Sequence, residues 1–173
     1  MWRRNLILAQ LCLVIAASGL RAEEPKDATK NSGEIRLPLK DFKFKVPEEQ
    51  ADLFVFDEDG ERLCFYTNGA AEVKFIAPSD GDFDLVLSLA GDSADKVYPK
   101  FKLTIDDKEF GKETSLKSDD IKDYKFALSL KRGKHTLAVA FTNDTYKDGE
   151  YDSNLYFHGA KLVPHAAETP TKK

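Results

Sequence analysis

The middle of the chain alternates apolar and polar residues with a period of two, the pattern of β-strands that bury one face. In residues 82–89, every second residue from Phe83 to Leu89 is a large apolar one. No segment of helical length keeps a period of 3.6 residues, and only 48–52 and 115–122 are candidates for a single helical turn. The same alternation recurs in a series of further segments: 35–39, 42–46, 101–105, 124–130, 137–141 and 155–162.

Short turn sequences separate these segments. Asp59-Gly60, Asn68-Gly69 and Asp80-Gly81 supply residues that tolerate positive φ angles, as tight connections require. Half-buried strands at roughly regular spacing predict an all-β fold, an antiparallel β-sandwich of about 8–10 strands. A closed barrel is the alternative, because strand periodicity alone does not distinguish the two.

The first 22 residues have the composition of an export signal. Arg3 and Arg4 precede an apolar stretch, and Leu20-Arg21-Ala22 fits a cleavage site. We therefore expect a signal peptide at 1–22 and an exported protein, either periplasmic or extracellular.

The rest of the chain divides by composition. Residues 23–33 are polar and rich in turn-forming residues, which predicts a flexible lead-in. Residues 34–163 hold the alternating segments and are expected to form the β-sandwich domain. Residues 164–173 are expected to be a disordered tail.

Charge and cysteine content narrow the function classes further. The net charge is −4, and the expected signal contributes three basic residues and no acidic ones. The mature chain is therefore clearly acidic, which argues against nucleic-acid binding. Its apolar runs are too short for a membrane span. Signal cleavage removes Cys12 and leaves Cys64, which we expect to be buried on a strand rather than redox-active.

No catalytic motif stands out. His135, His158 and His165 are too scattered for a zinc motif, although the first two could face each other across neighbouring strands. There is no Gly-x-Ser-x-Gly elbow and no phosphate-binding glycine loop. A hydrolase that uses two carboxylates is an alternative. Most acidic residues alternate with core residues or lie in turns, so we expect a protein that is not an enzyme.

Two acidic turns partly resemble calcium loops. Residues 57–61 lack the twelve-residue spacing of an EF-hand loop, and strand-like segments flank them. Residues 80–84 also alternate carboxylates, but those positions fit the outward face of a strand. A hairpin turn and a strand face are therefore the favoured interpretations.

The segment 134–163 differs from both. An apolar strand ends at Phe141, Asn143-Asp144 follow, and Asp152 lies just before the next strand. The carboxylates of Asp144 and Asp152 thus stand at opposite ends of one loop and converge if that loop folds back. Calcium takes about 6–8 oxygen ligands, including carbonyls and waters, and sugar hydroxyls can replace the waters. An ordinary acidic hairpin loop is the alternative.

These residues carry a resemblance to a known family. Phe141-Thr142-Asn143-Asp144 and Tyr151-Asp152-Ser153-Asn154-Leu155-Tyr156 resemble the signature of calcium-dependent xylan-binding modules, carbohydrate-binding module families 36 and 60. Residues 131–137 and 80–85 are similar to preceding segments of that family. The resemblance implies a jelly-roll-like sandwich that binds a xylan-like polysaccharide or oligosaccharide through calcium, without catalysis.

The resemblance also implies roles for single residues. Asp144 and Asp152 would be carboxylate ligands of Ca²⁺, and Tyr151 would offer its backbone carbonyl. Asn143 and Asn154 would shape the binding loop through hydrogen bonds. Tyr146 and Tyr151 would contact the sugar.

Two departures leave an alternative open. Ser153 stands where the family has Arg, and the mature chain has no Trp, so stacking on sugar falls to Tyr146, Tyr151 or Tyr156. The alternative is a structural or protein-interaction domain of the same fold that has lost sugar binding. Such modules are often attached to larger enzymes, and here we expect a separate enzyme or surface protein as the partner.

Overall fold

The structure is a computed structural model that describes residues 33–165. The expected signal peptide, residues 23–32 of the expected lead-in and residues 166–173 of the expected tail lie outside the described residues. The described part contains strands and two short 3₁₀-helices, in this order: β1 (Ile35–Leu37), η1 (Leu39–Asp41), β2 (Lys43–Lys45), η2 (Glu48–Leu53), β3 (Phe54–Asp57), β4 (Arg62–Phe65), β5 (Gly69–Ala77), β6 (Gly81–Asp92), β7 (Lys100–Ile105), β8 (Lys108–Ser115), β9 (Lys122–Leu130), β10 (Gly133–Phe141), β11 (Tyr146–Lys147), β12 (Tyr151–Asp152) and β13 (Asn154–Pro164).

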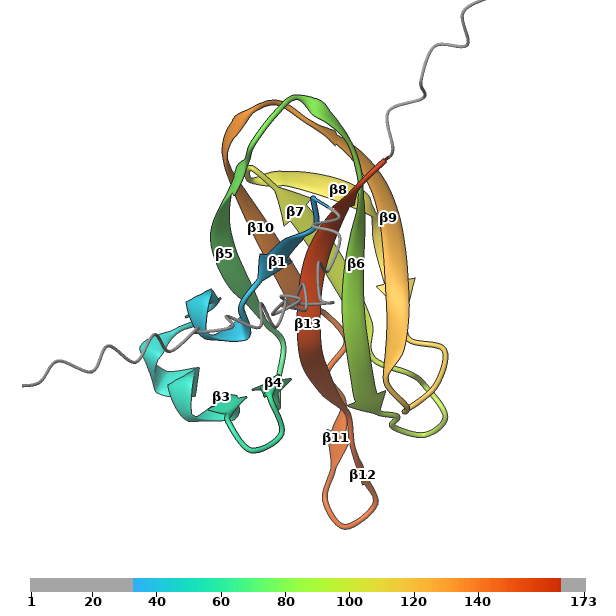
Figure 1. The fold of residues 1–173 in the computed structure, drawn as a ribbon. Coiled ribbons are helices and arrows are strands. Elements are labelled where there is room, and N and C mark those ends of the chain that lie inside the picture. Colours follow the sequence, from blue (N-terminus) through green and yellow to red (C-terminus); the bar gives the residue numbers. More distant parts are fainter. Residues whose placement is uncertain (1–32, 166–173) are drawn as a thin grey trace, which may run out of the picture. The chain divides into compact units, whose positions relative to one another are not determined.

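The long strands form two antiparallel sheets (Figure 1). The first sheet has the order β3-β4-β13-β6-β9, and β1 also pairs with β13. The second sheet has the order β2-β5-β10-β7-β8. Strands β11 and β12 form a separate ribbon that projects past the start of β13 (Figure 1). Both sheets have open edges, so the fold is the predicted antiparallel sandwich rather than a barrel.

Inward-facing side chains of both sheets share one core. Phe101 of β7 and Tyr124 of β9 pack edge to face, with ring centroids 5.4 Å apart. Alternate residues of β6, from Leu85 to Leu89, are fully buried, as the period of two predicts. Burying such a side chain contributes about 1.5–3 kcal/mol. The apolar face of each sheet is therefore stabilised by packing against the other sheet.

Several finer expectations can be compared with the structure. The strands are more numerous than expected, because the segments identified from the sequence include neither β5 and β8 nor the very short strands β11 and β12. Helix η2 covers the first candidate turn, whereas 115–122 contains the end of β8, bends and the start of β9, with no helix. Cys64 is buried at 1% exposure, as expected. The suggested contact between His135 and His158 is wrong, because β10 and β13 belong to different sheets.

The two acidic turns have the local structures that were favoured. Residues 58–61 join β3 to β4, and the Gly60 amide donates to the Asp57 carboxylate at 3.0 Å. Asp82 lies on β6 and accepts a hydrogen bond from Ser129. Their carboxylates therefore stabilise the turn and the sheet.

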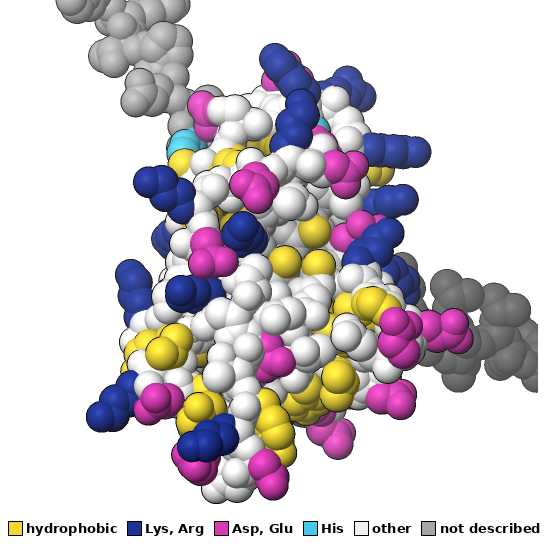
Figure 2. All heavy atoms as spheres, turned by 180° about the vertical axis from the view of Figure 1, so that it is seen from behind, with side chains coloured by type: hydrophobic (Ala, Val, Ile, Leu, Met, Phe, Trp, Pro, Cys, Tyr) yellow, Lys and Arg dark blue, Asp and Glu magenta, His cyan; other side chains and the backbone are white. Residues whose placement is uncertain are grey.

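The surface carries both signs of charge. On the face in Figure 2, lysine, arginine, aspartate and glutamate side chains are interspersed. This pattern lacks the continuous basic face that phosphate binding uses. Within the described residues, none of the helices has the length and apolar content needed to span a membrane.

Candidate functional site

The candidate loop lies where β10 ends and β13 begins. Phe141, at the end of β10, is 1% exposed, and Leu155, near the start of β13, is fully buried. These two anchors come from different sheets. The polar residues between them, 142–154, are therefore attached at both ends to the core.

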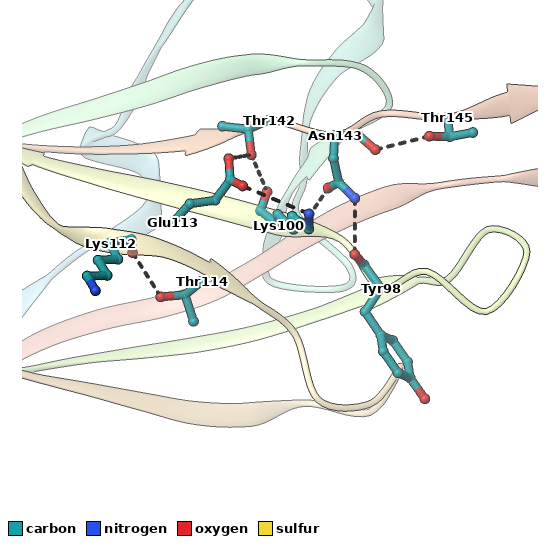
Figure 3. Close-up of polar contacts among 8 residues, drawn as sticks. All are labelled: Tyr98, Lys100, Lys112, Glu113, Thr114, Thr142, Asn143 and Thr145. Carbon is teal, nitrogen blue, oxygen red and sulfur yellow. Dashed lines mark hydrogen bonds and ion pairs between the residues drawn. The ribbon is translucent and has the colours of Figure 1, made fainter.

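Asn143 fixes the first part of this loop (Figure 3). Its side-chain oxygen accepts a hydrogen bond from the Lys100 amide at 2.5 Å, and its side-chain nitrogen donates to the Tyr98 carbonyl at 3.1 Å. The adjacent Thr142 hydroxyl lies 2.9 Å from the Glu113 carboxylate. Both ends of the Asn143 amide thus bond to backbone, an arrangement that shapes the loop.

Asp144 is held by the connection between β4 and β5. Its backbone N–H donates to the side-chain oxygen of Asn68 at 2.8 Å. Its Oδ2 atom accepts a hydrogen bond from the Thr67 hydroxyl at 2.9 Å. Its other carboxylate oxygen, Oδ1, is buried and has no hydrogen-bond partner in the structure. The side chain is therefore fixed by one oxygen while the other is left unused.

The ribbon of β11 and β12 brings the two ends of the loop together. Tyr146 pairs with Asp152, and the Ser153 amide donates to the Thr145 carbonyl at 2.9 Å. Asp144 and Asn154 therefore lie just outside the paired residues, at the base of the ribbon.

Asn154 has its amide in a defined orientation. The side-chain nitrogen donates to Asp92 Oδ2 at 3.2 Å and to Asp152 Oδ2 at 3.4 Å. The residue is 6% exposed, and its side-chain oxygen Oδ1 is buried without a partner. Asn154 therefore resembles Asp144 in presenting one unused oxygen.

The unpartnered atoms concentrate in this loop. Within residues 33–165, the buried side-chain nitrogen or oxygen atoms that lack a partner are Asp144 Oδ1, Ser153 Oγ and Asn154 Oδ1. Leaving a buried polar group unpaired costs about 1–3 kcal/mol. Three such atoms within eleven residues leave oxygens available for a further partner, and oxygen ligands suit a hard cation such as calcium.

No cluster of three or more His, Cys, Asp or Glu side chains suited to a metal occurs in the described part of the chain. A cation at this loop would therefore depend on amide, hydroxyl and carbonyl oxygens as well as carboxylates. Calcium accepts all of these ligands and tolerates irregular geometry. The residues present thus fit calcium better than zinc, which favours imidazole and thiolate.

The other residues expected at the site are more exposed. Asp152 is exposed, and its carboxylate lies against the Asn154 amide. The carboxylates of Asp144 and Asp152 accept hydrogen bonds from different side chains, Thr67 and Asn154. Tyr151 is partly buried in β12.

The two further tyrosines differ in availability. Tyr146 is 65% exposed, and its hydroxyl donates to Asp148 at 2.9 Å, a bond that raises the pKa of the phenol. The Tyr156 ring has the Arg62 guanidinium 4.5 Å from its centroid, and burial raises the pKa of its phenol. Tyr146 is therefore the more accessible surface for a ligand.

Three residues near the site were not identified from the sequence. Thr67 and Asn68 contact Asp144 from 77 and 76 residues away in the chain. Asp92 contacts Asn154 from 62 residues away. Asn68-Gly69 is visible in the sequence as a turn, but no spacing rule connects that turn to the loop after Phe141.

Comparison with known proteins identifies a family that this chain matches. A sequence model described as a calcium-dependent, xylan-binding carbohydrate-binding module matches residues 84–173. This range is about half of the chain and includes the whole 142–154 loop. Among curated proteins, none matches.

Solved structures share the fold at low sequence identity. A carbohydrate-binding module of family 36 from a multidomain xylanase of the Trinervitermes trinervoides hindgut metagenome has a TM-score of 0.57 and 13% identity, covering 79% of this chain and 99% of that one. A Podospora anserina mannanase with a family 35 module has a TM-score of 0.53 and 11% identity over 79% of this chain, which spans only 29% of the mannanase. A family 35 module from Clostridium thermocellum has a TM-score of 0.50 and 12% identity, covering 76% of this chain and 98% of that one.

Proposed function

Because the chain belongs to the family of calcium-dependent, xylan-binding carbohydrate-binding modules, we propose that it binds a xylan-like polysaccharide through a calcium ion held at the 142–154 loop. The observation that carries this proposal is the pair of buried, unpartnered oxygens Asp144 Oδ1 and Asn154 Oδ1, from the two ends of the loop. A bound cation would satisfy oxygens that otherwise destabilise the folded state.

Specific residues of the chain would hold the ion. Asp144 Oδ1 and Asn154 Oδ1 are the unused oxygens from the two ends of the loop. Asp152 lies on the exposed side, next to Asn154, and Tyr151 would contribute its carbonyl. Calcium bound here would supply open coordination positions for adjacent sugar hydroxyls.

The remaining residues would position the ligand. Tyr146 is exposed on the ribbon and offers a ring on which a sugar can pack. Asn143 would keep the loop in place through its bonds to backbone. The position of Ser153, where the family has Arg, is buried at 1% exposure. The substitution therefore alters packing beneath the loop rather than its exposed side.

The wider assignments belong to the same proposal. The protein would be exported and would act without catalysis, bringing a separate enzyme or surface protein to polysaccharide. A hydrolase is tested by measuring the release of reducing sugar from a panel of polysaccharides, where we expect none.

Calorimetry with calcium, and then with xylo-oligosaccharide in calcium or in EDTA, tests the binding proposal. We expect the wild-type protein to bind calcium, and to bind the sugar only with calcium present. Asp144→Ala should lose both activities.

The matched control is Asp148→Ala, because Asp148 is an exposed carboxylate of the same loop whose observed bond is to Tyr146. It should keep calcium binding. Wild-type protein that gives no heat and no thermal shift with calcium would overturn the proposal and favour a structural or protein-interaction domain. Normal binding by Asp144→Ala would disprove the site.

A further inference from the structure

The end of β6 places a carboxylate beside Asn154, a residue of the proposed calcium site. Asp92 is the last residue of β6 and pairs with Asn154 of β13. We propose that Asp92 is a positioning residue that sets the orientation of the Asn154 amide and thereby the calcium affinity. This inference rests on the proposed function, because it assigns Asn154 Oδ1 to the ion.

The orientation follows from which atoms can donate. A carboxylate only accepts hydrogen bonds, so the amide nitrogen of Asn154 has to face Asp92 and Asp152. The Asn154 oxygen then faces the opposite direction, where it is buried and unpartnered. Reversing the amide would present an NH₂ group at the ion site, and NH₂ cannot bind a cation.

Asp92 has the better geometry of the two carboxylates. Its Oδ2 atom lies 3.2 Å from the Asn154 nitrogen, whereas Asp152 Oδ2 lies at 3.4 Å. Asp92 and Asp152 are both exposed, but Asp152 belongs to the two-stranded ribbon and is itself a proposed ligand, whereas Asp92 ends a long strand of the first sheet. Asp92 is therefore the group whose loss would free the amide to rotate.

Asp92 is itself held by side chains of the first sheet. The Tyr156 hydroxyl donates to the same Oδ2 atom at 2.5 Å. The Arg62 guanidinium stacks on the Tyr156 ring and donates to Asp57 at 3.0 Å. This line of contacts crosses β6, β13, β4 and β3, so the position of Asp92 does not depend on an ion.

The backbone around Asp92 is equally constrained. A Cβ atom on Gly91 would lie 2.4 Å from the Asn154 carbonyl oxygen, so only glycine allows the two strands to approach this closely. The Ser93 amide donates to the Asp119 carboxylate at 3.0 Å. The backbone is thus held in place on both sides of Asp92.

Positioning rather than ligation fits these contacts. Asp92 Oδ2 already accepts two hydrogen bonds, from Asn154 and from Tyr156. Groups that orient metal ligands in this way typically change metal affinity by 10–100-fold when they are removed.

The experiment compares three variants of the full chain. We expect Asp92→Ala to weaken calcium binding about tenfold in calorimetry. Asp92→Asn keeps a side-chain oxygen that can accept both hydrogen bonds, so it should stay close to wild type although the charge is removed. The control Asp123→Ala removes an exposed carboxylate that accepts from Ser88 on the same sheet, and it should leave calcium affinity unchanged.

A second measurement needs no calcium. In EDTA, nuclear magnetic resonance should detect the Asn154 side-chain NH₂ protons as slowly exchanging in the wild type and in Asp92→Asn. Those protons should exchange faster in Asp92→Ala, while the unfolding temperature shows that the variant is folded.

The outcomes separate the two proposals. Calcium binding by Asp92→Ala at wild-type affinity, or unchanged NH₂ exchange in that variant, overturns the role of Asp92 and leaves the proposed function intact. Loss of binding in Asp92→Asn as complete as in Asp144→Ala also overturns positioning, because it would make Asp92 a ligand. Wild-type protein that does not bind calcium overturns both proposals.

Discussion

The two ends of β10 differ in whether the polar side chains beside them have hydrogen-bond partners. At the start of the strand, Asp106 accepts from the Thr136 amide at 2.9 Å and lies 2.8 Å from His135 Nδ1. The other ring nitrogen of His135 lies 2.7 Å from the Lys131 carbonyl. Nearby, Asp80 accepts from the Arg132 amide at 2.7 Å and from Lys131 Nζ at 3.0 Å.

Beyond Phe141, the opposite end of β10 leaves oxygens of Asp144 and Asn154 buried and unpaired. Both ends are rich in carboxylates, so composition does not distinguish them. The distinction lies in whether the fold itself completes the hydrogen bonds. Carboxylates whose oxygens all have hydrogen-bond donors join turns to each other, whereas buried oxygens without a donor are available to a ligand.

The largest expected effect is stabilisation by calcium at the incomplete end. At a free concentration of about 100 times Kd, a ligand that binds only the folded state adds about 2.7 kcal/mol to the free energy of unfolding. We expect this gain in the wild type and none in Asp144→Asn, measured by thermal unfolding with calcium and with EDTA.

Asparagine keeps an oxygen for the Thr67 hydroxyl, so Asp144→Asn should be at least as stable as wild type in EDTA. A large loss of stability there would show that the Asp144 carboxylate serves the fold, as the carboxylates at the other end do.

The second effect concerns the start of β10, where the carboxylates have hydrogen-bond partners. Asp106→Asn leaves one side-chain oxygen for two donors, His135 and the Thr136 amide. We expect a loss of about 1–2 kcal/mol in the free energy of unfolding, with or without calcium. Asp107→Asn is the control, because both positions have positive φ, 51° and 62°, which asparagine tolerates. Equal effects of the two substitutions would contradict a specific role for Asp106.

The third effect returns to the Asp144 carboxylate. Thr67→Val removes the hydroxyl that holds Oδ2 while keeping the shape of the side chain. We expect calcium affinity to fall about tenfold in calorimetry. Thr145→Val, which removes an exposed hydroxyl bonded to the Asn143 carbonyl at 3.3 Å, should have little effect. A reversed ranking would move the site away from Asp144.

The smallest effect is a pH dependence from His135. Both ring nitrogens face acceptors, the Lys131 carbonyl and Asp106, and these bonds raise the pKa of the imidazole. A raised pKa in the folded state means that His135 stabilises the protein fully below its unfolded pKa of about 6.5. That stabilisation is lost as the pH rises through the higher, folded pKa.

Thermal unfolding in EDTA between neutral and mildly alkaline pH measures this loss. The side chains facing His135 are Asp106 and the Phe75 ring, whose centroid lies 5.6 Å away, and the Asp106 pKa is lowered mainly by its bond to His135. His135→Gln should remove the slope in that range. An unchanged slope would assign it to another group.

Much of the fold could be predicted because its strands are half buried. In β10, residues 137–141 alternate between buried and less buried positions, so the alternation in the sequence matches the geometry of the strand. In β6 the large apolar residues from Phe83 to Leu89 follow the same period, although Val86 between them is buried too. Strand β8 could not be found in this way. It is an edge strand whose residues are largely exposed, so its pattern carries no burial signal.

Of the proposed site, only the residues that are neighbours in the sequence could be predicted. Asp144, Asp152 and Asn154 lie within one short segment with a recognisable order. Thr67 and Asp92 reach the same place through the pairing of strands in space. Which oxygen of Asp144 is used, and which way the Asn154 amide faces, depends on those distant partners and has no local signature.

The hydrogen bond between Thr67 and Asp144 joins parts of the chain that lie 77 residues apart. A contact over this separation requires a long loop to close, which costs chain entropy. The proposed ion would therefore bind the assembled molecule and not an early folding intermediate. Calcium bound there would hold together two segments that are distant in the sequence.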